Sequence, residues 1–128
     1  MATAEIAVAI PAVVLLLGGL IAVIAAVAAQ LRCVDAAREG ARAAARGDSA
    51  SVVVSIAQRA APNGAAVSVA INGDTVTVTV QAPTRPVGGL VGTYTVTASA
   101  TGRMEPTSDD AGPVPATKDA ATVAGPAP

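Results

Sequence analysis

The sequence is constrained most by one stretch near its amino end that carries no charged side chain. This run extends from Ile6 to Leu31, a length of 26 residues, and nearly all of its side chains are aliphatic or small. With a rise of about 1.5 Å per residue, an α-helix of this length measures about 39 Å. The hydrocarbon core of a bilayer is about 30 Å thick. The run therefore predicts a membrane-spanning helix over residues 6–31.

Two other structures compete for such a run. A core helix of a soluble protein rarely reaches this length without a charge. A cleaved secretory signal starts with basic residues and has an apolar stretch of about 7 to 15 residues. Here residues 1–4 contain no basic side chain, Glu5 is acidic, and the apolar run is longer. We therefore expect the segment to remain in the mature protein.

Helix-favouring residues continue beyond the apolar run without a breaker. Residues 32–46 are amphipathic, and their arginines recur every four residues from Arg38 to Arg46. Gly47 follows, and glycine readily takes the left-handed conformation that ends many helices. The pattern predicts one helix from about Thr3 to Arg46, about 65 Å long.

The next residues predict a second, short helix. Asp48, Ser49 or Ser51 can cap its amino end, and the sequence Pro-Asn-Gly at 62–64 contains residues that end helices. The predicted helix runs from about Ala50 to Ala61 and has one apolar side.

Two alternating segments on either side of Asn72-Gly73 predict a β-hairpin. Residues 65–71 and 74–80 carry mostly Val or Ile at every second position, and Asn-Gly is a preferred dipeptide for a two-residue turn. Such a turn would place the valines of both strands on one face. The predicted pairs are Ile71 with Asp74, Val69 with Val76, and Val67 with Val78.

Alternation resumes after a loop rich in Pro and Gly at residues 81–92, which predicts a third strand over Thr93–Ala100. The expected fold class is α+β: a long amino-terminal helix at 1–47, then a small helix-plus-β domain at 48–105 with a three-stranded antiparallel sheet. Residues 106–128 are Pro, Ala, Gly, Thr, Ser and Asp with few large apolar side chains, so they predict a disordered tail.

Composition excludes several classes of function. The chain has no His and one Cys, so a Ser-His-Asp triad, a Cys-His dyad and a zinc site of His and Cys are impossible within it. It has one Tyr, no Phe, no Trp and a net charge of −1, which argues against a nucleic-acid-binding surface. We expect no catalysis, no cofactor and no metal, and we expect no nucleic-acid partner.

Glu5 is the most informative single residue. A carboxylate directly ahead of a long apolar run must reach water at the membrane surface or find a cationic partner. It is tolerated in a first helical turn by the helix dipole. Alternatively, it pairs with the α-amino group of Met1 in a neighbouring subunit and sets the axial register between packed helices.

Three further features of the long helix bear on packing. Pro11 removes one backbone hydrogen bond inside the apolar run and predicts a kink or local unwinding. Small residues recur about every four positions and form a stripe that allows close helix packing in lipid; its members are Gly18, Ala22, Ala26 and Ala29. Cys33 follows the run as a small hydrophobic residue, a lipidation site or an intersubunit disulfide.

The amino-terminal sequence resembles that of TadE-like minor pilins from Flp (tight adherence) type IV pilus systems. The resemblance covers roughly residues 1–105 and lies in the segments Thr3-Ala4-Glu5, Ala9-Ile10-Pro11, residues 32–42 and Arg46-Gly47-Asp48. It implies that Met1 is the amino terminus left by a prepilin peptidase and that Glu5 is the register contact.

The same resemblance implies a structural role in pilus assembly. The partners would be other pilin subunits, prepilin peptidase, the membrane assembly machinery and the lipid bilayer. The small domain would lie outside the cytoplasm, first at the cytoplasmic membrane and later in the extracellular pilus. The arginines after the span, taken alone, predict the opposite orientation. The alternative function is a single-pass envelope anchor that presents a small protein-binding domain.

Overall fold

The computed structural model describes residues 1–85, 89–90 and 92–105. Its elements are α1 (Ala2–Ala45), α2 (Ala50–Ala60), β1 (Ala66–Asn72), β2 (Thr75–Thr84) and β3 (Tyr94–Arg103). The three strands form one antiparallel sheet in the order β1-β2-β3. The predicted α+β class is therefore confirmed. The predicted tail, residues 106–128, lies outside the described residues.

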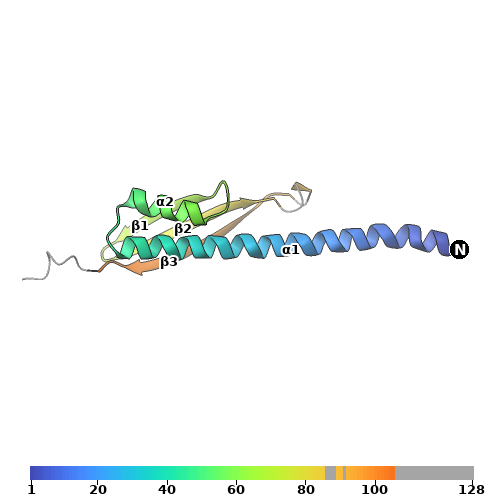
Figure 1. The fold of residues 1–128 in the computed structure, drawn as a ribbon, viewed down its shortest axis with the longest axis horizontal. Helices are drawn as coiled ribbons and strands as arrows, with labels where there is room; N and C mark the ends of the chain where they lie inside the picture. Colours follow the sequence, from blue (N-terminus) through green and yellow to red (C-terminus); the bar gives the residue numbers. More distant parts are fainter. Residues whose placement is uncertain (86–88, 91, 106–128) are drawn as a thin grey trace, which may run out of the picture.

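Helix α1 is the axis of the molecule (Figure 1). It begins and ends one residue earlier than predicted. Gly47 has a φ of 88°, its N–H donates to the Ala44 carbonyl at 3.0 Å, and the Asp48 N–H donates to the Ala43 carbonyl at 3.2 Å. These two bonds form a Schellman motif, which satisfies carbonyls at the helix end. The motif turns the chain back, so that all later elements lie beside α1.

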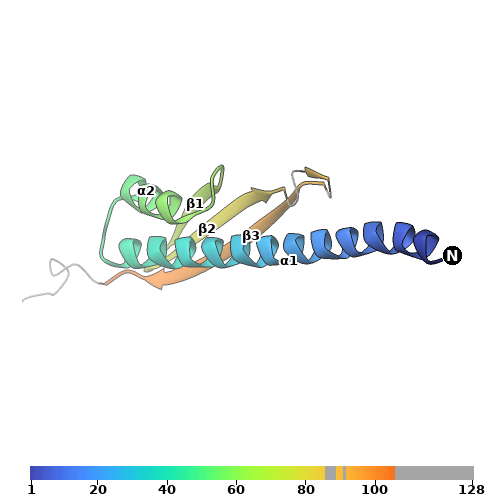
Figure 2. The same ribbon diagram turned by 45° about the vertical axis from the view of Figure 1, so that its right-hand side comes forward.

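The helix continues without interruption through Pro11. The expected local unwinding is therefore absent, and Figures 1 and 2 show α1 as one continuous coil. The physical reason is that proline removes a single N–H donor, while the turns on both sides keep their own hydrogen bonds.

Helix α2 packs against both α1 and the sheet. Ser49 is its N-cap residue, but the Ser49 hydroxyl bonds to that of Ser51 at 3.1 Å and makes no side-chain cap. The Ser49 carbonyl accepts from the Val53 N–H at 3.0 Å. Val53 and Ala57 are the buried side chains of the helix, which places its apolar side on α1 and the valines of the sheet.

The register of the hairpin differs from the prediction by two residues. The turn residues are Gly73 and Asp74, so Asn72 pairs with Thr75. Gly73 takes a φ of 63°, as hairpin turns with a first-position glycine require. A shift of two residues keeps every side chain on its predicted face. The observed pairs are Ile71 with Val76, Val69 with Val78, and Val67 with Val80.

Strands β2 and β3 extend further than their sequences predict. β2 continues to Thr84 and includes Pro83, which the sequence assigned to a loop. The last residue of β2 that pairs with β1 is Gln81, so beyond it β2 needs no donor toward β1, and a proline is tolerated on such an edge. Pro83 pairs with Thr95 on the other side.

The core lies between the sheet and the helices and consists of small side chains. The inner face of β2 contributes Val76, Val78, Val80 and Ala82, all of which are buried. The carboxyl-terminal half of α1 contributes only small buried residues: Cys33, Ala36, Ala37, Gly40, Ala41, Ala43 and Ala44. The outer face of the sheet carries mostly Thr and Ser and is covered by neither helix.

Two glycines permit the close approach of α1 to the sheet. A Cβ built on Gly102 of β3 would lie 2.8 Å from the Ala41 carbonyl oxygen, and one on Gly40 would lie 2.9 Å from Val78 Cγ1. Contacts under 3.0 Å require a shift of the neighbouring atoms. At Gly102 that neighbour is backbone, which has little freedom to move within a packed helix.

Cys33 is part of this core. Its side chain is fully buried with Ala36, Ala37, Val80 and Ala82, and burial raises the pKa of the thiol above its ordinary value. Of the roles open to Cys33 from the sequence, burial favours the small hydrophobic residue, because acyl transfer or a second thiol would require the core to open.

Replacing Gly102 with Ala should destabilise the small domain. The added methyl group overlaps the Ala41 carbonyl, and overpacking of this kind typically costs about 1–3 kcal/mol. For a domain of this size, each kcal/mol lowers Tm by about 4–8 °C. Thermal unfolding of the full chain in detergent, followed by circular dichroism, measures the change. Ser99→Ala, on the exposed outer face of the same strand, is the control. Equal Tm values for both variants would contradict the close contact.

The thiol of Cys33 should react slowly with maleimide while the protein is folded. Burial blocks the reagent, and the raised pKa reduces the thiolate that reacts at pH 7–8. Mass spectrometry of timed samples should show full labelling in denaturant and little labelling without it. Labelling at equal rates in the two conditions would place Cys33 at the surface.

Candidate assembly site on the amino-terminal helix

The first two thirds of α1 make almost no contact with the other residues that the structure describes. We call residues 2–31 the free segment. None of its side chains is buried, and Val8, Leu15 and Leu16 are 73%, 77% and 76% exposed. Large apolar side chains cover the helix except along one stripe of small apolar residues. A helix that is apolar all round is normally enclosed by lipid or by other protein. This segment is long and apolar enough to cross a membrane.

Glu5 lies in the first turn of this segment. Its side chain is exposed, and it lines a shallow apolar groove with Met1, Ala4 and Val8. In residues 1–85, 89–90 and 92–105, the ion pairs join Arg46 to Asp48 and Arg103 to Asp74, both at 3.3 Å. Glu5 belongs to neither pair. Its carboxylate is therefore available to a cation from outside the described residues. The carboxylate also lies close to the unsatisfied N–H groups at the helix end.

The small-residue stripe lies on a definite side of α1. With 3.6 residues per turn, Gly18, Ala22, Ala26 and Ala29 are in line with Cys33, Ala36 and Gly40, which face the sheet. The stripe is thus the continuation of the face that carries the small domain. A second helix packed on the stripe would lie on the same side of α1 as that domain.

One polar contact joins the free segment to the sheet. The Gln30 side-chain amide donates to the Thr97 carbonyl at 3.2 Å. Gln30 is the single polar residue between Ile6 and Leu31, and that isolation was the signal that sequence reasoning missed. The sheet therefore reaches α1 one residue inside the apolar run.

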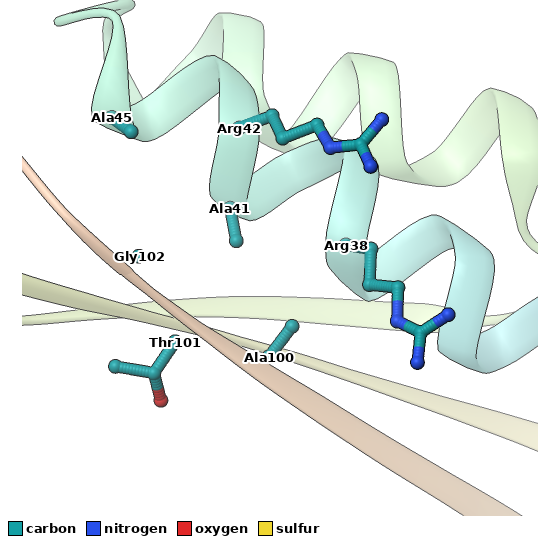
Figure 3. Close-up of a pocket in the computed structure, with 7 residues that line it drawn as sticks. All are labelled: Arg38, Ala41, Arg42, Ala45, Ala100, Thr101 and Gly102. Carbon is teal, nitrogen blue, oxygen red and sulfur yellow. The ribbon is translucent and has the colours of Figure 1, made fainter.

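A hollow with a volume of about 230 Å³ lies between α1 and β3 (Figure 3). Its walls include the stems of Arg38 and Arg42, and the close contact of Ala41 with Gly102 forms part of its lining. In Figure 3 both guanidinium groups extend along the helix, away from Ala45 and Gly102. The lining offers no carboxylate, thiol or imidazole for acid, base or nucleophilic chemistry.

Metal chemistry has no obvious site either. No group of three or more His, Cys, Asp or Glu residues that could hold a metal ion occurs in the part of the chain that the structure describes. The features that distinguish this structure are therefore surfaces: an unpartnered apolar helix with an acid in its first turn, and a small domain folded back along it.

Comparison with known proteins gives one informative relationship. No protein-family model and no solved structure match the chain. A protein of Mycobacterium tuberculosis named apoptosis inhibitor Rv3655c is 42% identical over 109 residues, which cover 85% of this chain and 83% of the relative. Identity at this level over most of both chains shows common ancestry, and the chain therefore belongs to the same protein family as apoptosis inhibitor Rv3655c.

Proposed function

We propose that this protein is a structural, pilin-like subunit that acts as a minor pilin in the assembly of a Flp-type type IV pilus. The observation that carries the proposal is α1 itself. Apart from the hydrogen bond between Gln30 and Thr97, its first thirty residues pack against no other element that the structure describes, whereas its last third forms the core of a small domain. Such a helix needs one environment before assembly and another after it, namely lipid and then neighbouring helices.

The position of Glu5 supports this proposal. In the membrane, the carboxylate stays near the surface at the end of the span, where an acid costs little. Inside a bundle of such helices it would be surrounded by apolar side chains, and an unpaired charge there is expensive. The α-amino group of Met1 in a neighbouring subunit would neutralise it. This pair would form only at one axial offset between helices, which makes it a register contact.

The proposal assigns further partners and a location. A prepilin peptidase would generate Met1 as the mature amino terminus, and the membrane assembly machinery would transfer the subunit from the bilayer to the filament. The small domain would lie outside the cytoplasm. The stripe from Gly18 to Ala29 would allow a neighbouring helix to pack closely on α1. That helix would lie on the face of α1 that also carries the small domain.

A second candidate is a single-pass envelope anchor that presents a protein-binding domain. The outer face of the sheet favours it, because exposed Thr and Ser side chains cover that face and neither helix shields it. The M. tuberculosis relative is named an apoptosis inhibitor, a role unlike pilus assembly. On this second reading Glu5 is only an acid at the membrane surface.

Replacing Glu5 with Ala separates the two functions. A pilin should remain in the membrane at its normal level and lose at least about 90% of its incorporation into pili, because the register contact is gone. An anchor should keep both its membrane level and its partner binding. Immunoblots of membrane and sheared-pilus fractions measure the distribution.

Glu39→Ala is the matched control, since Glu39 is an exposed acid of the same helix outside the free segment. We expect this variant to enter pili normally. Normal incorporation of the Glu5 variant would refute the pilin assignment.

Processing supplies an independent test. Native protein should begin at Met1 after removal of a leader, and a longer precursor should accumulate when prepilin peptidase is deleted. Terminal sequencing and intact mass of protein from both strains measure this. An identical chain in the two strains would show that the peptidase does not act on this protein.

A further inference from the structure

One end of the sheet projects along α1 toward the amino terminus. Strand β3 runs beside the helix, with Gly102 against Ala41 and the Thr97 carbonyl bonded to Gln30. Tyr94 precedes Thr97 by three residues, or about 10 Å of extended strand. Between these two contacts five strand residues, 97–102, advance as far as eleven helical residues, 30–41, so 10 Å of strand corresponds to about six or seven helical residues. Tyr94 is therefore level with about residues 23–24, inside the free segment. Figures 1 and 2 both show this end of β2 and β3 pointing toward the amino terminus.

The level matters because the apolar run is longer than a bilayer core. About 39 Å of helix exceeds a core of about 30 Å by roughly six residues. If the span begins at Ile6, beside Glu5, the hydrocarbon ends near residue 25, and residues 26–31 lie among the headgroups. The β2–β3 end then meets the boundary between headgroups and acyl chains.

The side chains at this end suit that boundary. Leu90 is 86% exposed and Tyr94 is 38% exposed, although an isolated apolar side chain gains nothing from water. Tyr94 is the single aromatic residue of the sequence, and tyrosine is enriched at membrane interfaces, where its ring contacts apolar groups and its hydroxyl stays hydrated. Arg85 directly follows β2 and is exposed. Arginine side chains can bind lipid phosphates.

We propose that the β2–β3 end of the sheet is a second membrane contact, in which Leu90 and Tyr94 enter the headgroup boundary of the leaflet from which α1 emerges. The contact rests on the membrane anchoring by α1 that the proposed function also requires. It holds the domain against the bilayer and fixes the rotation of α1 about its own axis. The stripe at Gly18–Ala29 lies on the same face of α1 as the domain, so its direction within the membrane is then fixed as well.

Fluorescence quenching by lipids tests this contact. The chain has no Trp, so a single introduced Trp reports one position. The full-length Leu90→Trp variant is reconstituted in phosphatidylcholine vesicles with brominated acyl chains. We expect its emission to fall at least twofold relative to vesicles without bromine. Ile71→Trp is the matched control: Ile71 is also an exposed apolar residue, 59% exposed, but it is paired through Val76 with Gly102 at the opposite end of the sheet. We expect no quenching there.

Val13→Trp, in the middle of the free segment, reports insertion of α1 and should be strongly quenched. Quenching at Val13 with none at Leu90 overturns the second contact and leaves the anchor intact. No quenching at Val13 overturns both. The unmodified protein is a control for misfolding of the variants. Tyr94 is its single fluorophore, and we expect the brominated lipids to quench it. The outcome is independent of pilus incorporation of the Glu5 variant, so failure of the pilin function and failure of this contact are distinguishable.

Discussion

The close contact between the carboxyl-terminal half of α1 and the sheet is the interaction on which the rest of the structure depends. Without Phe or Trp, the domain cannot fill space with large side chains, so it brings backbone close to backbone instead. Gly102 against the Ala41 carbonyl and Gly40 against Val78 set that distance. The same contact keeps the sheet alongside α1, so that the β2–β3 end of the sheet reaches the apolar run. The stability and the elongated shape of the domain thus both depend on positions that lack a Cβ atom.

Much of the fold could be predicted from local sequence signals. The long uncharged run, the Gly47 stop and the alternating valines correctly indicated two helices, three strands and the buried face of the hairpin. The register was wrong by two residues because Asn72-Gly73 was taken as the turn, whereas the turn uses Gly73 and Asp74. Asp74 is engaged there by long-range contacts: its carbonyl accepts from the Met104 N–H at 2.7 Å, and its carboxylate pairs with Arg103. A propensity argument cannot include partners thirty residues away.

The remaining errors have the same cause. Local sequence rules predict that a strand ends at Pro83. β2 nevertheless continues, because β1 no longer pairs with it beyond Gln81 and no N–H donor is needed on that side. Gly40 and Gly102 carry no signal until the helix is laid on the sheet. For the candidate site, Glu5 and the apolar run were visible in the sequence, but the side of α1 on which the small-residue stripe lies required the fold. Local unwinding at Pro11 was expected on the assumption that one lost hydrogen bond outweighs those of the adjacent turns, but those turns hold the helix continuous.

The return of the chain after Gly47 has a practical consequence for handling the molecule. At the end of the described fold, the Glu105 N–H donates to the Ala45 carbonyl at 3.2 Å, so the chain leaves beside the carboxyl end of α1. That point stands about 65 Å along the helix axis from Met1. A fluorescent protein, an epitope or a nanobody tag fused after Glu105 would occupy the pole most distant from the apolar end of α1. Both the amino terminus and the β2–β3 end would stay unobstructed, which makes this position suitable for a tag on the intact protein.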